Sequence, residues 1–196
     1  MRNDDVCLQL YLIRHAESMG NVETEENFDV MNPPLTFHGH RQVQALSERM
    51  SAVRLDAVYS SPLERAINTA LPFATECGCD VKFDAMLCEK DICVSFKGFS
   101  SFAESDSECA ERARSFIEKL LNENRNGAVA VVSHGEFIQF LIREAMGISR
   151  CSNIKFCVYN SSVTKINFRI DKPNKLAFQN DISHLLELDG DKTEWM

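Results

Sequence analysis

Two patterns of apolar and polar residues alternate along the chain up to about position 146, one typical of strands and one typical of helices. Short strand-like runs occur at 10–13, 56–60, 80–83 and 127–133. Between them, apolar residues recur every three or four positions, as on a helix that buries one face. The alternation predicts an α/β fold, a three-layer sandwich with helices on both faces of a mostly parallel central sheet.

Residues that favour helix ends indicate where the predicted helices begin and stop. Thr36 is the expected N-cap of a helix that continues to Val53. Ser61, Pro62 and Glu64 together are typical of a helix start, with Ser61 as the N-cap. The predicted helices cover residues 36–53, 61–78, 105–124 and 136–146.

A different pattern follows near the end of the chain. Ile166, Phe168 and Ile170 alternate with polar residues, and a turn at 171–174 leads toward residues 176–178. Strict alternation is typical of a strand with one buried face. We therefore expect an antiparallel edge hairpin in this region.

Length and composition fit one domain. A chain of 196 residues with 44% hydrophobic residues can form a sizeable core, and no Pro-, Gly- or Ser-rich linker divides it. We expect one domain over 1–196, with flexible ends at 1–6 and 187–196 and a small cap at about 85–103. The cap contains three aromatic residues that either line a pocket or pack within the cap: Phe96, Phe99 and Phe102.

The net charge limits the classes of partner. Twenty-one basic residues against 29 acidic ones give −8, which argues against nucleic acid or an anionic membrane surface. No apolar run is long enough to span a bilayer, and the first residues lack the apolar core of a signal peptide. We expect a cytoplasmic protein with a small substrate, and the oligomeric state stays open.

The eight cysteines are scattered, without a C-x-x-C pair. In the absence of a secretory signal, free buried thiols are expected rather than disulfides. Cys77 and Cys79 lie close in sequence, but no second pair of ligands at a suitable spacing accompanies them. The sequence therefore predicts no structural metal site.

Basic residues stand where the predicted strands end. Arg14 and His15 follow the first strand, and Arg65 comes shortly after the second. His134 and Gly135 follow the apolar run that ends at position 133. Ligands of such sheets bind beyond the carboxyl ends of the strands, so we expect these residues to converge. Arginine matches phosphate oxygens, and a neutral imidazole held through one nitrogen can attack phosphorus, so the pattern predicts a phosphoryl site.

Several ordered blocks resemble the histidine phosphatase superfamily, in the branch similar to phosphoglycerate mutases and small phosphomonoesterases. "LYLIRHAES" resembles the first-histidine block, "VYSSPLERAINTA" the arginine block and "VVSHGEFIQFL" the second-histidine block. "MLCEKD" supplies the glutamate of the family, and the resemblance extends over residues 8 to 186. So many blocks in the right order are specific to this family.

The resemblance implies roles for the matched residues. His15 is implied as the nucleophile that becomes phosphohistidine. Glu89 is implied to protonate the leaving oxygen and then to activate water. The groups implied to bind the phosphoryl oxygens are Arg14, Arg65, His134, Asn21 and the backbone near Gly135. Neither a metal nor another cofactor is implied.

Departures from the family pattern leave alternatives open. Cys93 stands where the family has a glycine after the glutamate, and Glu136 replaces a second glycine after the second histidine. Glu104 and Glu136 are therefore alternatives to Glu89 as the proton donor. Asn21 has an alternative role as a cap of its own loop. Three further histidines are expected to be structural or solvated: His38, His40 and His184.

Three functions are compatible with these residues. The first is a metal-independent phosphomonoester hydrolase that acts on a small metabolite through phosphohistidine. The second is a phosphoglycerate mutase-type phosphotransferase, which in this family carries an Arg-rich segment after the donor. Here that segment contains Lys90 and Lys97 but no arginine before Arg112, so hydrolysis is favoured. The third, a non-catalytic phosphoryl-binding module, ranks last because His15 and Glu89 are both present.

Overall fold

The computed structural model describes residues 5–23, 27–90, 92–95, 98–101, 104–124, 126–149 and 152–188. Its main sheet contains β1 (Val6–Arg14), β2 (Ala57–Ser60), β3 (Val81–Phe83), β6 (Gly127–Ser133), β7 (Val163–Arg169) and β8 (Lys175–Asp181). The order is β3-β2-β6-β1-β7-β8, and the first four of these strands are parallel. Strand β7 is antiparallel to β1, and β8 is antiparallel to β7. The predicted mostly parallel sheet with an antiparallel edge is confirmed.

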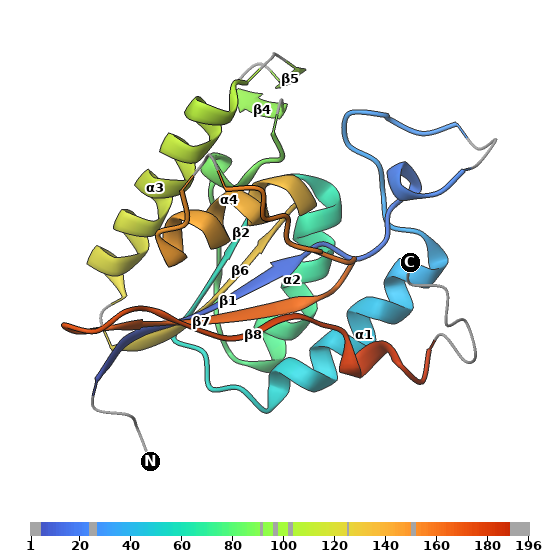
Figure 1. Ribbon diagram of the computed structural model, residues 1–196. Helices are drawn as coiled ribbons and strands as arrows, with labels where there is room; N and C mark the ends of the chain where they lie inside the picture. Colours follow the sequence, from blue (N-terminus) through green and yellow to red (C-terminus); the bar gives the residue numbers. More distant parts are fainter. Residues whose placement is uncertain are drawn as a thin grey trace.

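Helices cover both faces of this sheet (Figure 1). Helices α1 (Phe37–Ser51) and α2 (Glu64–Glu76) pack together on one face, and α3 (Asp106–Glu123) and α4 (Gly135–Met146) pack together on the other. The predicted three-layer sandwich is therefore confirmed. Because β6 lies in the middle of the sheet, both of its faces are covered, which explains why its sequence is almost wholly apolar.

The alternation of side chains along β1 builds the two halves of the core. Leu8, Leu10 and Leu12 belong to the cluster with α3 and α4. Tyr11 and Ile13 belong to the cluster with α1 and α2. Successive side chains of a strand point to opposite faces, so one apolar strand anchors both helical layers. This packing fixes the end of β1, where Arg14 and His15 follow.

Helix starts show one correction. Thr36 caps α1 as predicted, because its hydroxyl accepts a hydrogen bond from Gly39 N (2.9 Å). The prediction that Ser61 caps α2 is wrong, since that helix begins at Glu64 with Leu63 as its N-cap. The hydroxyl of Ser61 lies instead 2.8 Å from Nε2 of His134. A tertiary contact thus uses the side chain that the local sequence assigns to the helix.

The segment after β3 contains the short helix η2 (Ala85–Leu87) and the strands β4 (Ile92–Ser95) and β5 (Gly98–Ser101). The two strands form an antiparallel hairpin, which projects beyond the start of α3 at the top of Figure 1. The side chains of Phe96, Phe99 and Phe102 lie outside the described residues, as do both chain ends, 1–4 and 189–196.

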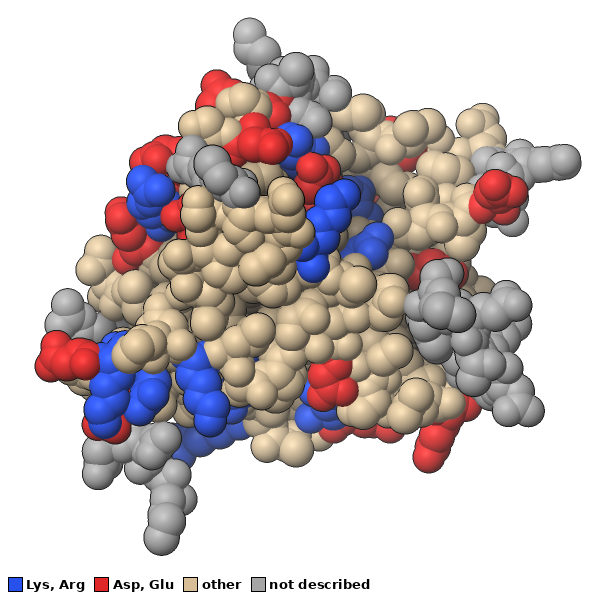
Figure 2. All heavy atoms as spheres, viewed as in Figure 1, with Lys and Arg blue, Asp and Glu red and all other residues tan. Residues whose placement is uncertain are grey.

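Charged side chains lie on the described surface, whereas the described cysteines are mostly buried or partly buried. On the face shown in Figure 2, acidic and basic side chains are interspersed along the edges, and uncharged residues occupy most of the centre. No helix among the described residues is long and apolar enough to cross a membrane. The described cysteines are free thiols, as expected. Cys88 and Cys109 are buried, but Cys157 is exposed, so the prediction of burial is wrong for that residue.

Candidate active site

The ends of three neighbouring strands bring the basic residues together. Strands β2, β6 and β1 are adjacent and parallel, so their carboxyl ends lie at one edge of the sheet. Arg14 is paired in register with Ser133, and the backbone N–H of His15 donates to the carbonyl of Ser133 (2.9 Å). His134 follows directly, so sheet pairing itself sets the two histidines side by side.

The rings of His15 and His134 lie with their centroids 5.1 Å apart and are tilted by 57°. Both side chains are buried. Nδ1 of His15 lies 2.7 Å from the carbonyl oxygen of Ala16, and because a carbonyl only accepts, this nitrogen carries the proton. Nε2 of His15 therefore holds the free lone pair, which is the form that a nucleophile requires.

Burial and nearby charges keep both histidines neutral. The pKa of His15 is lowered well below 6.5 by burial, with further contributions from the guanidinium groups of Arg65 and Arg14. The pKa of His134 is also lowered well below 6.5, by burial first and then by His15 and the same arginines. A charged imidazole would be desolvated beside two cations, so the neutral form prevails.

On these two histidines and two arginines, three buried nitrogen atoms have no hydrogen-bond partner among the described residues: Arg14 Nε, Arg65 Nη1 and His134 Nδ1. The Ser61 hydroxyl has one proton, and its two possible acceptors are Nε2 of His134 (2.8 Å) and the weaker, more distant Cys88 Sγ (3.9 Å). We assign the proton to the bond with Nε2, which leaves the ring proton of His134 on Nδ1. Buried donors are usually paired, so three unpaired donors in one place favour a multivalent acceptor such as a phosphoryl group. Arg14, His15, Arg65 and His134 are called the basic floor below.

Gly135 allows the guanidinium of Arg14 to lie close to the backbone at the start of α4. A Cβ atom at this position would lie only 3.3 Å from Nε and Cζ of Arg14. The guanidinium of Arg14 is also held from another direction, because its Nη1 donates to the carbonyl of Val158 (2.7 Å). Since α4 begins at Gly135, the N-terminus of this helix lies at the floor and adds a positive dipole.

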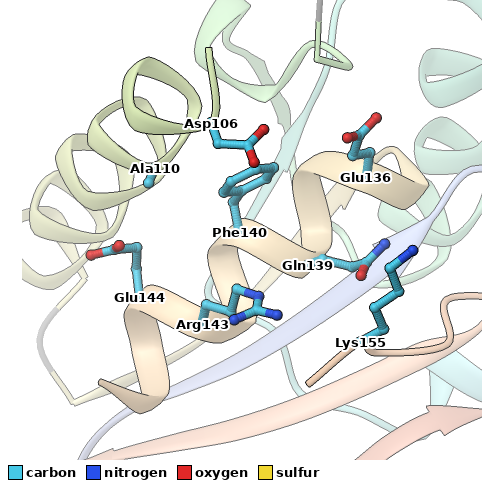
Figure 3. A pocket seen from close by; sticks show the side chains of 8 residues that line it. All are labelled: Asp106, Ala110, Glu136, Gln139, Phe140, Arg143, Glu144 and Lys155. Carbon is cyan, nitrogen blue, oxygen red and sulfur yellow. The ribbon is translucent and has the colours of Figure 1, made fainter. Parts of the chain in front are cut away.

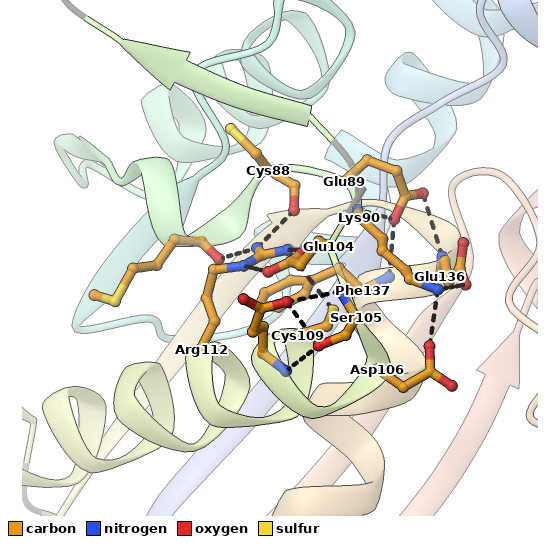
Figure 4. A network of polar contacts seen from close by, with 12 residues as sticks. Cys88, Glu89, Lys90, Glu104, Ser105, Asp106, Cys109, Arg112, Glu136 and Phe137 are labelled. Atoms are coloured by element: carbon orange, nitrogen blue, oxygen red, sulfur yellow. Dashed lines mark hydrogen bonds and ion pairs between the residues drawn. The ribbon is translucent and has the colours of Figure 1, made fainter. Parts of the chain in front are cut away.

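Glu89 lies at the same helix N-terminus. Its Oε1 accepts hydrogen bonds from the backbone N–H groups of Phe137 (2.9 Å) and Lys90 (3.0 Å), and its Oε2 accepts one from Glu136 (3.3 Å) (Figure 4). Burial lowers the pKa of Arg14 and of Arg65, and the charge of Glu89 opposes that change at both. This carboxylate is therefore close enough to the floor to interact with both of its arginines.

A model of the histidine phosphatase superfamily (branch 1) matches the chain over residues 10–97 and 93–181. The chain belongs to this superfamily. A probable phosphoglycerate mutase of Salmonella arizonae is 26% identical over 185 residues, covering 83% of this chain and 86% of the relative.

Two solved structures show the same fold. A mutant of phosphoserine phosphatase from Entamoeba histolytica, in complex with phosphoserine, matches with a TM-score of 0.74 and 23% identity, covering 91% of this chain and all of the other. A mycobacterial glucosyl-3-phosphoglycerate phosphatase in complex with VO3 matches with a TM-score of 0.71 and 19% identity, covering 88% of this chain and 98% of the other.

The two alternative proton donors are paired with cations. Glu104 forms an ion pair with Arg112 (2.6 Å) and is largely buried. The carboxylate of Glu136 lies 3.3 Å from Nζ of Lys90. Of the three candidates, only Glu89 accepts the N–H groups that open α4. Its position supports Glu89 over the other two.

Asn21 lies at the edge of the site, in the exposed loop after β1. Its Oδ1 accepts hydrogen bonds from the backbone N–H and the hydroxyl of Ser18 (both 3.0 Å) and from Nδ2 of Asn160 (3.2 Å). These contacts correspond to the loop-capping alternative, and phosphoryl binding by Asn21 stays a prediction. Asn160 also donates to the carbonyl of His15 (3.0 Å), a contact that no sequence pattern indicated.

Three further residues support the floor, and none of them was assigned a role in the site from the sequence. Ser61 contacts His134. The hydroxyl of Thr69 accepts a hydrogen bond from the N–H of Ala16 (2.9 Å), which joins the loop after His15 to α2. A Cβ at Gly39 would lie 2.0 Å from the carbonyl oxygen of Glu17, so only glycine allows α1 to pack there. The signal for the first two was present, since both lie in the arginine block of the superfamily.

A hollow of about 380 Å³ lies along the solvent-facing side of α4 (Figure 3). Its lining residues on that helix recur at helical spacing, and the full set is Asp106, Ala110, Glu136, Gln139, Phe140, Arg143, Glu144 and Lys155. None of the residues of the basic floor is among them. Glu136, at the start of α4, is the member that also lies beside Glu89.

Proposed function

We propose that this protein is a metal-independent phosphomonoester hydrolase that acts on a small phosphorylated metabolite through a phosphohistidine at His15. The observation that carries the proposal is the basic floor. It combines a neutral histidine that holds a free lone pair with three buried donors that have no partner among the described residues. That combination suits attack on a phosphoryl group and binding of its oxygens.

In the first step, Nε2 of His15 attacks phosphorus, and the bond between phosphorus and the ester oxygen breaks. Arg14, Arg65 and His134 bind the phosphoryl oxygens as charge shifts toward the leaving group. Glu89 in its protonated form gives its proton to the leaving oxygen, so that the alcohol departs neutral. The products are the free alcohol and phosphohistidine.

In the second step, water attacks the phosphorus of phosphohistidine. Glu89, now a carboxylate, takes a proton from this water as the bond between phosphorus and Nε2 breaks. Inorganic phosphate leaves, His15 returns to its neutral form and Glu89 is protonated again. The net reaction is hydrolysis of one ester bond by one water molecule.

Hydrolysis is favoured over the mutase reaction by the residues after Glu89. A mutase must also hold a second acidic group of its substrate and keep water from the phosphoenzyme. Lys90 is paired with Asp106 (2.8 Å) and Glu136 (3.3 Å), and Arg112 is paired with Glu104. These cations are therefore already neutralised. The probable mutase of Salmonella arizonae keeps phosphotransfer as the second candidate function.

The test measures hydrolysis of p-nitrophenyl phosphate in excess EDTA by the wild type and by His15→Ala. We expect metal-independent turnover and a loss of about 10,000-fold or more in kcat for the variant. His40→Ala, at an exposed position of α1, is the matched control and should keep full activity. Turnover that survives His15→Ala, or that disappears in EDTA, would contradict the proposal.

The mutase alternative is tested on the same preparations. Interconversion of 2- and 3-phosphoglycerate that is faster than release of inorganic phosphate would favour phosphotransfer. Binding of inorganic phosphate without any turnover would favour the non-catalytic module.

A further inference from the structure

Arg112 of α3 contacts the segment that carries Glu89, although it lies outside every block that resembles the family. We propose that Arg112 is the positioning residue of the proton donor, and that it acts only through Glu89. The inference rests on the proposed function. Residues 86–89 are called the donor segment.

Side chains hold three successive carbonyl groups of the donor segment. Nη1 of Arg112 donates to the carbonyl of Met86 (2.7 Å) and to that of Cys88 (2.9 Å). Between them, the carbonyl of Leu87 accepts a hydrogen bond from the hydroxyl of Ser133 (2.7 Å). The segment is thus joined to α3 through Arg112 and to the basic floor through the residue that precedes His134.

The other groups of the guanidinium are also engaged (Figure 4). Nε and Nη2 donate to the two carboxylate oxygens of Glu104 (2.8 and 2.6 Å), an ion pair that is largely buried on both sides. Burial is the largest single influence and lowers the pKa of Arg112, but the hydrogen bonds with Glu104, together with the electrostatic effects of Cys109, Glu104 and Cys88, raise the pKa overall. Arg112 therefore stays charged, and its planar guanidinium binds the Glu104 carboxylate and the donor-segment carbonyls at the same time.

Arg112 also packs against the residue that binds the carboxylate. Its guanidinium carbon lies 3.9 Å from the ring centroid of Phe137, in a cation–π arrangement. The backbone N–H of Phe137 donates to Oε1 of Glu89 (2.9 Å). One side chain thus contacts both the backbone before Glu89 and the helix turn that receives its carboxylate.

These contacts predict an effect on proton donation rather than on phosphoryl binding. The hydrogen bonds and the ion pair of Arg112 within the described residues go to Glu104, Met86, Cys88 and Cys109, and not to the four floor residues. Its effect on the floor is electrostatic, because its charge contributes to the lowered pKa of His134. Loss of its fork would leave Met86 and Cys88 carbonyls without this donor and let the Glu89 carboxyl group shift. Proton transfer depends steeply on position, so the step that needs the proton should suffer.

The test compares kcat/KM for two esters, because this ratio reports the steps up to formation of phosphohistidine. p-Nitrophenyl phosphate releases a phenolate that leaves readily without a proton, whereas β-glycerol phosphate releases an alkoxide that requires one. We expect Arg112→Met to lower kcat/KM for β-glycerol phosphate about 30- to 100-fold and that for p-nitrophenyl phosphate less than about threefold. Arg112→Lys keeps the charge but loses the planar guanidinium, so its kcat/KM for each ester should lie between that of Arg112→Met and that of the wild type.

Arg114→Met is the matched control, since Arg114 lies on the same helix and pairs at the surface with Glu111 and Glu144. This variant should leave kcat/KM unchanged for both esters. A double-mutant cycle sharpens the test further. If Arg112 acts through Glu89, then Arg112→Met should have little further effect in a Glu89→Gln background.

The outcomes separate this inference from the proposed function. Equal losses on both esters, or full additivity with Glu89→Gln, would overturn the positioning role. If Arg112→Met does not fold, as judged by circular dichroism, the ester ratio is read from Arg112→Lys, and an unchanged ratio overturns the inference. If the wild type hydrolyses neither ester, the proposed function fails and this inference fails with it.

Discussion

The basic floor and the donor segment meet in one site, but they are supported in different ways. Floor residues sit where strands end and helices begin, so the sheet ladder and helix starts fix their backbone. His15, for example, is fixed by the pairing of β1 with β6. Among the described residues the donor segment has no partner strand, and side chains such as Arg112 and Ser133 hold its carbonyl groups instead.

The two parts also differ in how their polar atoms are satisfied. The floor keeps three buried donors without a partner among the described residues, whereas the carboxylate of Glu89 accepts three N–H groups. Unpaired donors suit the binding of an external anion, and a well-held carboxyl group suits repeated proton transfer at a fixed place. This difference teaches that binding and proton transfer can be disturbed separately.

Among the changes that compare the floor with the donor segment, removal of a floor cation should have the largest effect. Arg65→Ala should lower kcat/KM by about 1,000-fold for both p-nitrophenyl phosphate and β-glycerol phosphate, because phosphoryl charge must be stabilised whatever the leaving group. Arg41→Ala, at an exposed position of α1, should leave both values unchanged. A loss confined to one ester would contradict the assignment of Arg65 to the floor.

Removal of the donor should have a smaller and more selective effect. Glu89→Gln keeps the size of the side chain but cannot give a proton, so kcat/KM for β-glycerol phosphate should fall about 100- to 1,000-fold. The value for p-nitrophenyl phosphate should fall far less. Glu136→Gln is the comparison variant on the neighbouring carboxylate. If that variant shows the selective loss instead, the proton donor is Glu136.

The floor was predictable from the sequence because its residues stand at the ends of recognisable strands. Local patterns failed where a tertiary contact used the same residue differently. Ser61 lies in a sequence that is typical of a helix start, yet its hydroxyl contacts His134, 73 positions away. No local spacing contains that information.

The donor side was less predictable for the same reason. Glu89 was assigned only through the family resemblance, and the loop after it departs from the family pattern. Arg112 counted merely as the first arginine after the donor. Its hydrogen bonds span 24 and 26 positions and depend on how α3 packs against η2, which helix spacing does not specify.

Acid should weaken folding through the floor. The pKa values of His15 and His134 lie well below 6.5 in the folded protein, and burial lowers that of His184 to about 4. Below pH 6.5 the unfolded chain therefore binds more protons than the folded chain, and stability is lost as pH falls toward the folded pKa values. Each histidine contributes up to about 1.4 kcal/mol per pH unit in this range.

Urea unfolding at pH 7.5, 6.5 and 5.5 measures this slope. His134→Asn should reduce it by about 1 kcal/mol per pH unit between pH 6.5 and 5.5, and by less between pH 7.5 and 6.5, because one titrating group is removed. Carboxylates whose folded pKa is lowered, such as Asp181, titrate below this range and do not contribute to it. A free energy of unfolding that stays constant from pH 7.5 to 5.5 would show that the floor histidines are not held neutral by folding.

The smallest expected effect distinguishes Ser61, which supports the floor, from Arg112, which supports the donor segment. Ser61→Ala removes the hydroxyl that contacts Nε2 of His134, a hydrogen bond worth about 1 kcal/mol, or roughly fivefold in rate. Because Ser61 supports the floor, kcat/KM should fall equally for both esters, whereas Arg112→Met should lower mainly the value for β-glycerol phosphate. A selective loss in Ser61→Ala would mean that His134 takes part in proton transfer to the leaving group, and the floor and the donor segment would then act as one unit.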